Sequence, residues 1–282
     1  MFVRGGPFTS VRMNRWPAIK RFSPFSQSPR VSVVRLHGSI GSGPRAALSD
    51  EAIGTVIEKA FRKGRPKAVA LLINSPGGSP VQSSLIAARI RRLAEEKDIP
   101  VHAFVEDVAA SGGYWLACAA DDIWTDFGSI VGSIGVISAG FGAPVFLARQ
   151  GLERRVYTSG KSKSQLDPFK PENEEDVERL KTLLGDMHAG FIDYVKSRRG
   201  DRLRGGEDIF SGEFWLGRRA ANLGLVDGEA HLVPKLKELY GDDVRLSLFK
   251  RKKGLFARFG ASAAQDALAA IEERADFARF GL

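Results

Sequence analysis

The sequence has little cysteine and histidine, and its first 30 residues contain no acid. Cys118 is the only cysteine among 282 residues, so no disulfide can form within the chain, and we expect it to reside in a reducing cytoplasm. Residues 1–30 also lack a continuous apolar run, so we expect no secretory signal there. The composition that remains, 43% hydrophobic and 27% charged, is typical of a globular protein with a substantial core.

The net charge of +9 is unevenly distributed along the chain. Residues 1–30 carry six basic residues, and residues 245–282 carry eight basic against four acidic residues. Such ends either serve solubility or contact an anionic surface, which could be a phospholipid leaflet or nucleic acid. No recognised nucleic-acid reader motif accompanies the charge, so we expect no nucleic-acid partner. The membrane alternative predicts peripheral attachment to the inner face of the membrane.

One long uncharged run lies between Asp126 and Arg149. Its length suffices to cross a bilayer. Five glycines, one proline and three serines interrupt it, however, and such residues are unfavourable in a continuous apolar span. We therefore interpret residues 127–148 as buried core.

The apolar periodicity predicts an α/β fold. Residues 68–73 are apolar on both faces, as in a central strand of a parallel sheet, and strand-like and helix-like segments alternate along the chain. We expect a turn at residues 107–110, strands over residues 31–36, 68–73, 101–105 and 155–158, and helices over residues 53–61, 81–95, from about 111, and 172–198.

These elements predict one folded domain over residues 31–244. Residues 1–30 are expected to form a flexible basic arm. Residues 245–282 mix bases with aromatics and end in an amphipathic pattern, which predicts a helical extension. That extension either lies on a membrane surface or packs as a helix against the body of the protein.

Two glycine-containing turns follow consecutive predicted strands. "INSPGGS" (residues 73–79) lies at the carboxyl end of a strand, where open α/β sheets bind their ligands, although it also fits an ordinary turn. "AASGGYWLA" (residues 109–117) places Ser111 at the start of a helix. Ser111 is therefore either a helix cap or a nucleophile whose neighbour, Gly112, leaves room for a substrate carbonyl.

A serine nucleophile needs a base, and the histidines do not supply a recognisable one. None of the four, His37, His102, His188 and His231, lies in a triad context. A lysine can act instead if burial keeps it neutral, at a cost of roughly 4 kcal/mol. "TSGKSKS" (residues 158–164) offers Lys161 and Lys163, which spacing alone cannot separate and which composition would place on the surface.

Together, "INSPGGS", "AASGGYWLA", "GSIVGSIGV" and "TSGKSKS", in this order and at these spacings, resemble the signal peptide peptidase A family of Ser–Lys proteases. The resemblance spans roughly residues 31–240 and includes "GRRAANLGLVDG". It implies that Ser111 is the nucleophile, Lys163 the general base and Ser133 the residue that orients the lysine. It also implies an oxyanion hole formed by the backbone N–H groups of Gly78 and Gly112, with no metal or cofactor.

The resemblance further implies a fold, an assembly and a substrate class. The fold would be a stack of ββα units of the Clp protease/crotonase type, so residues 31–244 would be a single peptidase domain. Because the chain holds one such unit, we expect a closed homo-oligomeric ring in which Ser111 and Lys163 meet across a subunit boundary. The expected substrates are hydrophobic peptides such as cleaved signal peptides.

Two other classes of function remain open at this point. A crotonase-type acyl-CoA enzyme would use paired glycine turns to polarise a carbonyl but would need no serine nucleophile. A non-catalytic scaffold on a membrane surface would use only the basic ends.

Overall fold

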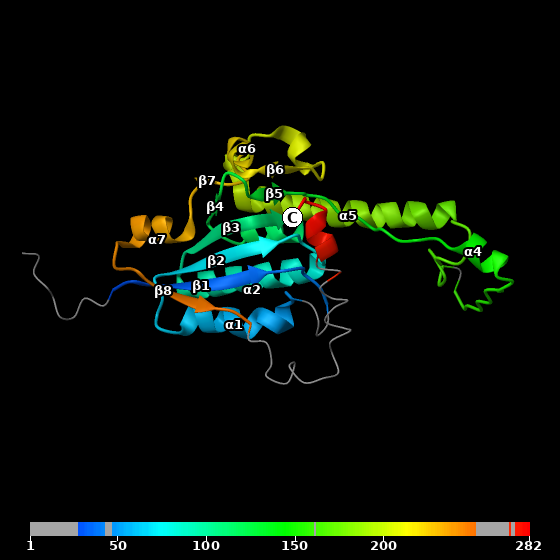
Figure 1. Ribbon diagram of the computed structural model, residues 1–282, viewed down its shortest axis with the longest axis horizontal. Coiled ribbons are helices and arrows are strands. Elements are labelled where there is room, and N and C mark those ends of the chain that lie inside the picture. The colour runs from blue at the N-terminus through cyan, green and yellow to red at the C-terminus, as the bar shows by residue number, and fades with distance from the viewer. Residues whose placement is uncertain (1–27, 43–46, 161, 252–270, 272–273) are drawn as a thin grey trace, which may run out of the picture.

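A mostly parallel sheet forms the centre of the computed structural model, which describes residues 28–42, 47–160, 162–251, 271 and 274–282 (Figure 1). Its order is β6-β5-β3-β2-β1-β8, with β4 beside β3 and β7 beside β4. Every pair is parallel except β5 with β6. The strands are β1 Arg30–His37, β2 Ala68–Ser75, β3 Val101–Ala110, β4 Asp122–Thr125, β5 Ile130–Gly132, β6 Phe214–Leu216, β7 Gly228–Glu229 and β8 Arg245–Phe249.

Helices connect the strands, and local sequence fixes where several of them begin. Ser49 caps α1 by accepting a hydrogen bond from the Ala52 N–H at 3.1 Å, and Ser79 caps α2, which has Pro80 in its first turn. The α-helices are α1 Asp50–Arg62, α2 Pro80–Lys97, α3 Gly112–Ala117, α4 Pro144–Arg149, α5 Glu174–Arg199, α6 Gly217–Asn222 and α7 Leu232–Tyr240, with two 3₁₀ turns at Gly200–Arg202 and Gly206–Phe210.

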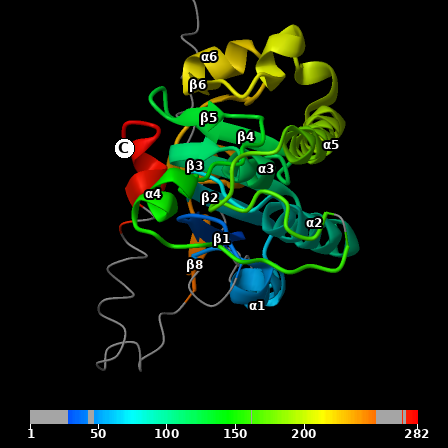
Figure 2. The same ribbon diagram turned by 90° about the vertical axis from the view of Figure 1, so that its right-hand side faces the viewer.

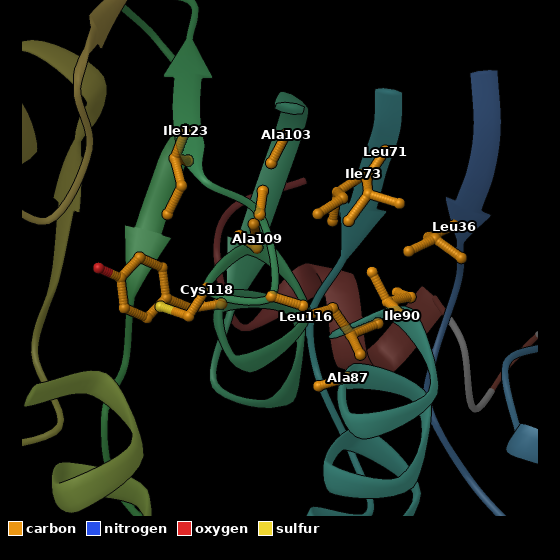
Figure 3. Close-up of a cluster of buried hydrophobic side chains, with 14 of the residues drawn as sticks. Leu36, Leu71, Ile73, Ala87, Ile90, Ala103, Ala109, Leu116, Cys118 and Ile123 are labelled. Atoms are coloured by element: carbon orange, nitrogen blue, oxygen red, sulfur yellow. The ribbon is translucent and has the colours of Figure 1, made fainter. Parts of the chain in front are cut away.

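The main core lies between the sheet and the helices α1, α2 and α3. Side chains from both layers meet there with no solvent exposure, as Figure 3 shows for Leu71, Ile73, Ile90 and Leu116. On the other face of the sheet, Leu236 of α7 packs against the first residues of β1 and β2. Strand β2 is therefore buried on both faces, as its unbroken apolar sequence predicted.

The α/β prediction is confirmed, with the sheet longer than expected at two places. Strand β3 continues to Ala110, where we expected a turn at residues 107–110, because it bulges against β2 between Ile73 and Ser75 and then pairs with β5. Strand β8 pairs with β1, so the sheet extends five residues into the predicted extension 245–282. The predicted arm 1–30 lies outside the described residues except for residues 28–30, as do residues 252–270 and 272–273 of the extension.

Two local predictions were wrong. The uncharged run 127–148 is not uniformly buried: Ile130, Val131 and Ile134 are, but Ile137 is 68% and Phe141 96% exposed. Residues 155–158 form no strand, since no neighbouring strand pairs with them. The absence of charge correctly indicated that residues 127–148 are apolar. It did not indicate whether other residues of the same chain bury them. Among the described residues, no helix combines the length and the apolarity needed to cross a bilayer.

The segment after β5 forms an arm that projects from the sheet (Figure 1). We define the arm as residues 137–160 and 162–187, which contain α4 and the first half of α5. It holds ten of the twenty exposed large hydrophobic side chains among the described residues. The second half of α5 packs on the body, where Trp115 stacks with Phe191 and with Tyr194 at ring-centroid distances of 4.7 and 4.9 Å.

Candidate active site

Ser111 lies between β3 and α3 in a backbone conformation that is unusual for a residue with a side chain. Its φ is +51° and its ψ is −119°, and its side chain forms no capping hydrogen bond with α3. The backbone is held on both sides, because Ser111 N–H donates to the Gly132 carbonyl at 2.8 Å and Trp115 N–H donates to the Ser111 carbonyl at 3.0 Å. Such held strain concentrates at functional sites, so the geometry favours the nucleophile over the cap.

The backbones of Gly112 and Gly78 lie side by side next to Ser111. A Cβ at Gly112 would lie 3.4 Å from the Gly78 nitrogen and 2.4 Å from the Ser83 Oγ, so a larger residue would have to displace the Ser83 hydroxyl. Gly78 has φ +136°, which also requires glycine. Neither backbone N–H donates a hydrogen bond to any described residue. Two free N–H groups beside a serine are what an oxyanion hole requires.

Ile40 supports both glycines, and sequence analysis missed it. Its N–H donates to the Gly77 carbonyl and its carbonyl accepts from the Ser79 N–H, each at 2.8 Å, so it brackets Gly78 on both sides. Its Cδ1 would lie 3.3 Å from a Cβ at Gly112. A single apolar residue among the glycines and serines of residues 38–42 was the only signal available in the sequence.

The pairing of β5 with β3 places Ser133 beside Ser111. Ala110 and Gly132 are register partners, and each serine directly follows one of them. Adjacent strands lie about 4.8 Å apart, so the two serines are neighbours. Ser133 also has a positive φ, +52°, and its N–H donates to the Glu213 carbonyl at 2.6 Å. Gly78, Ser111 and Ser133, which come from three consecutive motifs, therefore meet where β2, β3 and β5 end.

Lys163 does not reach this end of the sheet within its own chain. It is exposed and lies in the arm, where neighbouring Ser162 accepts a hydrogen bond from Arg179 in α5 at 2.9 Å, and Pro168 accepts one from the Ala143 N–H at 2.7 Å. No hydrogen bond between described residues joins its side chain to Ser111 or Ser133. Lys161 lies outside the described residues.

Among the described residues, no histidine or cysteine side chain is hydrogen-bonded to Ser111. His37, the last residue of β1, packs against Phe277 at a ring-centroid distance of 6.3 Å. His102 contacts Asp122 and Tyr240, His188 contacts the Ile134 carbonyl, and His231 contacts Asp126. Complete burial raises the pKa of the Cys118 thiol to about 12, so it remains protonated and unreactive at neutral pH. This end of the sheet thus holds a serine beside two unpaired backbone N–H groups, an arrangement suited to acyl transfer if another group supplies a base.

Asn74 supports the turn that carries Gly78. Its side-chain nitrogen donates to the Asp107 carboxylate at 2.5 Å, and its carbonyl accepts from the Gly38 N–H at 2.9 Å. It therefore joins β2 to β3 at the bulge that precedes the glycine turn, without contacting Ser111.

Known proteins match this chain in sequence and in fold. The profile of Peptidase family S49 matches residues 94–239, more than half of the chain. The Na(+)/H(+) antiporter NhaA of Brucella melitensis is 49% identical over 271 residues, which make up 89% of this chain and 37% of that protein. The chloroplastic serine protease SPPA of Arabidopsis thaliana is 31% identical over 208 residues, 70% of this chain and 30% of that protein.

This chain therefore spans about a third of the length of these two curated relatives, and the name of the antiporter describes a much longer protein. Among solved structures, a variant of the 1510-N membrane-bound stomatin-specific protease has a TM-score of 0.51 at 16% identity. The match covers 80% of this chain and all of that one, which shows that the two share a fold. The matched range, residues 94–239, contains Ser111, Ser133 and Lys163, whereas Gly78 precedes it.

Proposed function

This chain belongs to peptidase family S49, and on that premise we propose that it is a serine endopeptidase with Ser111 as nucleophile and Lys163 as general base. The observation that carries the proposal is the strained Ser111 beside two unpaired backbone N–H groups. Ser133, one strand away, orients the lysine amine in this scheme. The helix-cap interpretation of Ser111 is not favoured, because its side chain forms no capping bond.

The proposed reaction proceeds through an acyl-enzyme. Neutral Lys163 takes the hydroxyl proton of Ser111 as its oxygen attacks the peptide carbonyl, and the oxyanion is held by the N–H groups of Gly78 and Gly112. Protonated Lys163 then gives its proton to the leaving amine. Water then transfers a proton to Lys163 as its oxygen attacks the ester carbonyl. When the carbon–oxygen bond to Ser111 breaks, Lys163 returns that proton to the serine oxygen, which releases the acid and regenerates both groups. The scheme uses no metal or cofactor.

We propose hydrophobic peptides, such as cleaved signal peptides, as substrates. Strand β6 supports this class because it is an edge strand of the sheet and pairs with β5 directly before Ser133. Its Phe214 and Leu216 are 48% and 53% exposed. An extended apolar peptide can add to such an edge through backbone pairing, which tolerates varied sequences.

The position of Lys163 supports assembly, because Lys163 lies in the arm and not beside Ser111 of its own chain. The arm that carries Lys163 leaves its own sheet and presents exposed Phe141, Phe146 and Tyr157. Apolar side chains gathered on a projecting segment are typical of a surface that packs on another copy. We propose a homo-oligomeric ring in which the arm of one subunit delivers Lys163 to Ser111 of the next.

A fluorophosphonate probe tests the nucleophile. We expect it to label the wild-type oligomer at Ser111, identified by peptide mass spectrometry, and to leave Ser111→Ala unlabelled. A crotonase-type enzyme or a non-catalytic scaffold has no activated serine and would stay unlabelled. Labelling at another serine, with Ser111 unmodified, would contradict the assignment. Ser129, a buried serine hydrogen-bonded to the Glu106 carbonyl, gives an internal control that should not react.

We also propose peripheral attachment to the inner face of an anionic membrane, in the cytoplasm. Seven basic residues lie near the end of the sheet where the strands begin, opposite Ser111, and form no ion pair with any described residue. They include Arg30 and Arg245, which are register partners, and several bases around a surface hollow of about 520 Å³. The seven are Arg30, Arg62, Lys63, Arg65, Lys67, Lys97 and Arg245.

Flotation with phosphatidylglycerol vesicles tests this attachment. Neutralising Arg62, Arg65 and Lys67 to glutamine is expected to reduce the floated fraction several-fold, since each base near the surface contributes about 1 kcal/mol. The control neutralises three bases that are already paired with carboxylates, so it removes the same net charge: Arg92, Lys181 and Arg218. Equal flotation of the two variants, or flotation that is independent of anionic lipid, would rule out this surface.

A further inference from the structure

Residues 274–282 pack against the edge of the sheet that holds Ser111. Phe277 and Phe280 lie on Val108, Ala110 and Ile130, and Ala110 directly precedes Ser111 in the chain. Phe280 also contacts Phe214 of β6 edge-to-face at 5.3 Å. These residues, shown in red beside β3 in Figure 2, belong to the proposed peptidase site by position, although none of the four matched motifs includes them.

A hydrogen bond joins this segment to the support of the oxyanion hole. The Ser39 hydroxyl donates to the Asp276 carboxylate at 2.7 Å, between residues 237 positions apart in the chain. Ser39 directly precedes Ile40, and its own carbonyl accepts from the Leu48 N–H at 3.2 Å. Ile40 in turn brackets Gly78 through the hydrogen bonds to Gly77 and Ser79.

We infer that Asp276 is a positioning residue for the proposed reaction, which acts through Ser39 and Ile40 on the N–H of Gly78. The inference rests on the proposed function, because Gly78 matters in this way only if it stabilises an oxyanion. Backbone hydrogen bonds of Gly38, Ile40 and Gly41 also hold this segment, and the bond to Asp276 is the contact that ties Ser39 to residues 274–282.

The expected effect falls on the transition state. The Gly78 N–H faces a full negative charge only after the carbonyl has been attacked, so a displaced donor lowers kcat and leaves ground-state binding unchanged. Loss of a whole oxyanion donor costs about 10²- to 10³-fold in kcat, and a loosened donor should cost less, about tenfold. Asp276 itself touches no substrate in this account.

Four variants of the full chain test the inference by hydrolysis of an apolar peptide. Asp276→Ala and Ser39→Ala should each lower kcat about tenfold with KM within about twofold, and the double variant should be no worse than either single one. Asp276→Asn retains an acceptor oxygen and should restore most of the rate. Arg279→Ala, an exposed residue of the same segment, serves as the matched control and should behave like wild type.

Hydrogen exchange supplies a readout that does not depend on activity. The amides of Ile40 and Ser79 should exchange several-fold faster in Asp276→Ala than in Asp276→Asn, because their bonds bracket Gly78. Unchanged exchange and unchanged kcat in Asp276→Ala would overturn the inference, as would a rise in KM at constant kcat. A wild-type chain that the fluorophosphonate probe does not label would instead contradict the proposed function, while the exchange rates still decide the role of Asp276.

Discussion

Replacing Lys163 with alanine is expected to reduce peptide hydrolysis by at least about 10⁴-fold, whereas Lys161→Ala should retain the wild-type rate within about twofold. Removing the base leaves Ser111 with no group to take its proton, and members of such a catalytic set fail together rather than additively. Ser111→Ala should therefore be as inactive as Lys163→Ala, and the double variant no worse. The measurement is the initial rate of cleavage of an apolar peptide.

Folding and assembly are the controls for this comparison. Lys163 is exposed in the isolated chain and makes no side-chain contact with the described residues of the body, so its replacement should leave the unfolding temperature and the sedimentation coefficient unchanged. If Lys161→Ala were inactive and Lys163→Ala active, the assignment of the base would be wrong. If both were fully active, no Lys–Ser dyad of this kind would exist.

Mixing two inactive variants is expected to restore activity. In a ring where each site takes Ser111 from one subunit and Lys163 from the next, a site works when a Lys163→Ala subunit supplies the serine and a Ser111→Ala subunit the lysine. Random assembly from equal amounts gives such a pair at about a quarter of the boundaries. Co-refolded mixtures should therefore recover about a quarter of the wild-type rate, measured on the same peptide.

The opposite result would have an equally clear meaning. If each dyad formed within one chain, every subunit in the mixture would lack one partner and the mixture would stay inactive. Co-refolding equal amounts of wild-type protein and the Ser111→Ala, Lys163→Ala double variant is the matched control: sites at subunit boundaries should keep about a quarter of the wild-type rate, and sites within one chain about half.

The parts of the fold that depend on local periodicity could be predicted from the sequence. Residues 68–73 are apolar on both faces and form β2, and the spacing in residues 172–198 matches α5, Glu174–Arg199. The turns that carry Gly78 and Ser111 were found because a glycine pair follows an apolar segment in each, although that pattern also fits an ordinary turn. These predictions used interactions between residues close in sequence.

The predictions that were wrong, and the contacts that were missed, depend on residues far apart in the chain. Residues 127–148 were predicted to be buried core because they carry no charge, but Phe141 is 96% exposed. Hydrophobicity does not say whether a side chain is covered by its own chain or by another copy. Ile40 has no motif of its own, and its role follows from contacts with Gly77 and Ser79 nearly forty residues away. The adjacency of Ser111 and Ser133 likewise follows from strand register, which the sequence alone did not specify.

The most direct test of the account is the distance between Ser111 Oγ and Lys163 Nζ in an experimental structure of the active oligomer. We predict a hydrogen-bond distance of about 3 Å across a subunit boundary, with the amine enclosed by the neighbouring subunit. An amine that remains in solvent at every copy, with no other lysine beside the serine, would contradict the Ser–Lys mechanism.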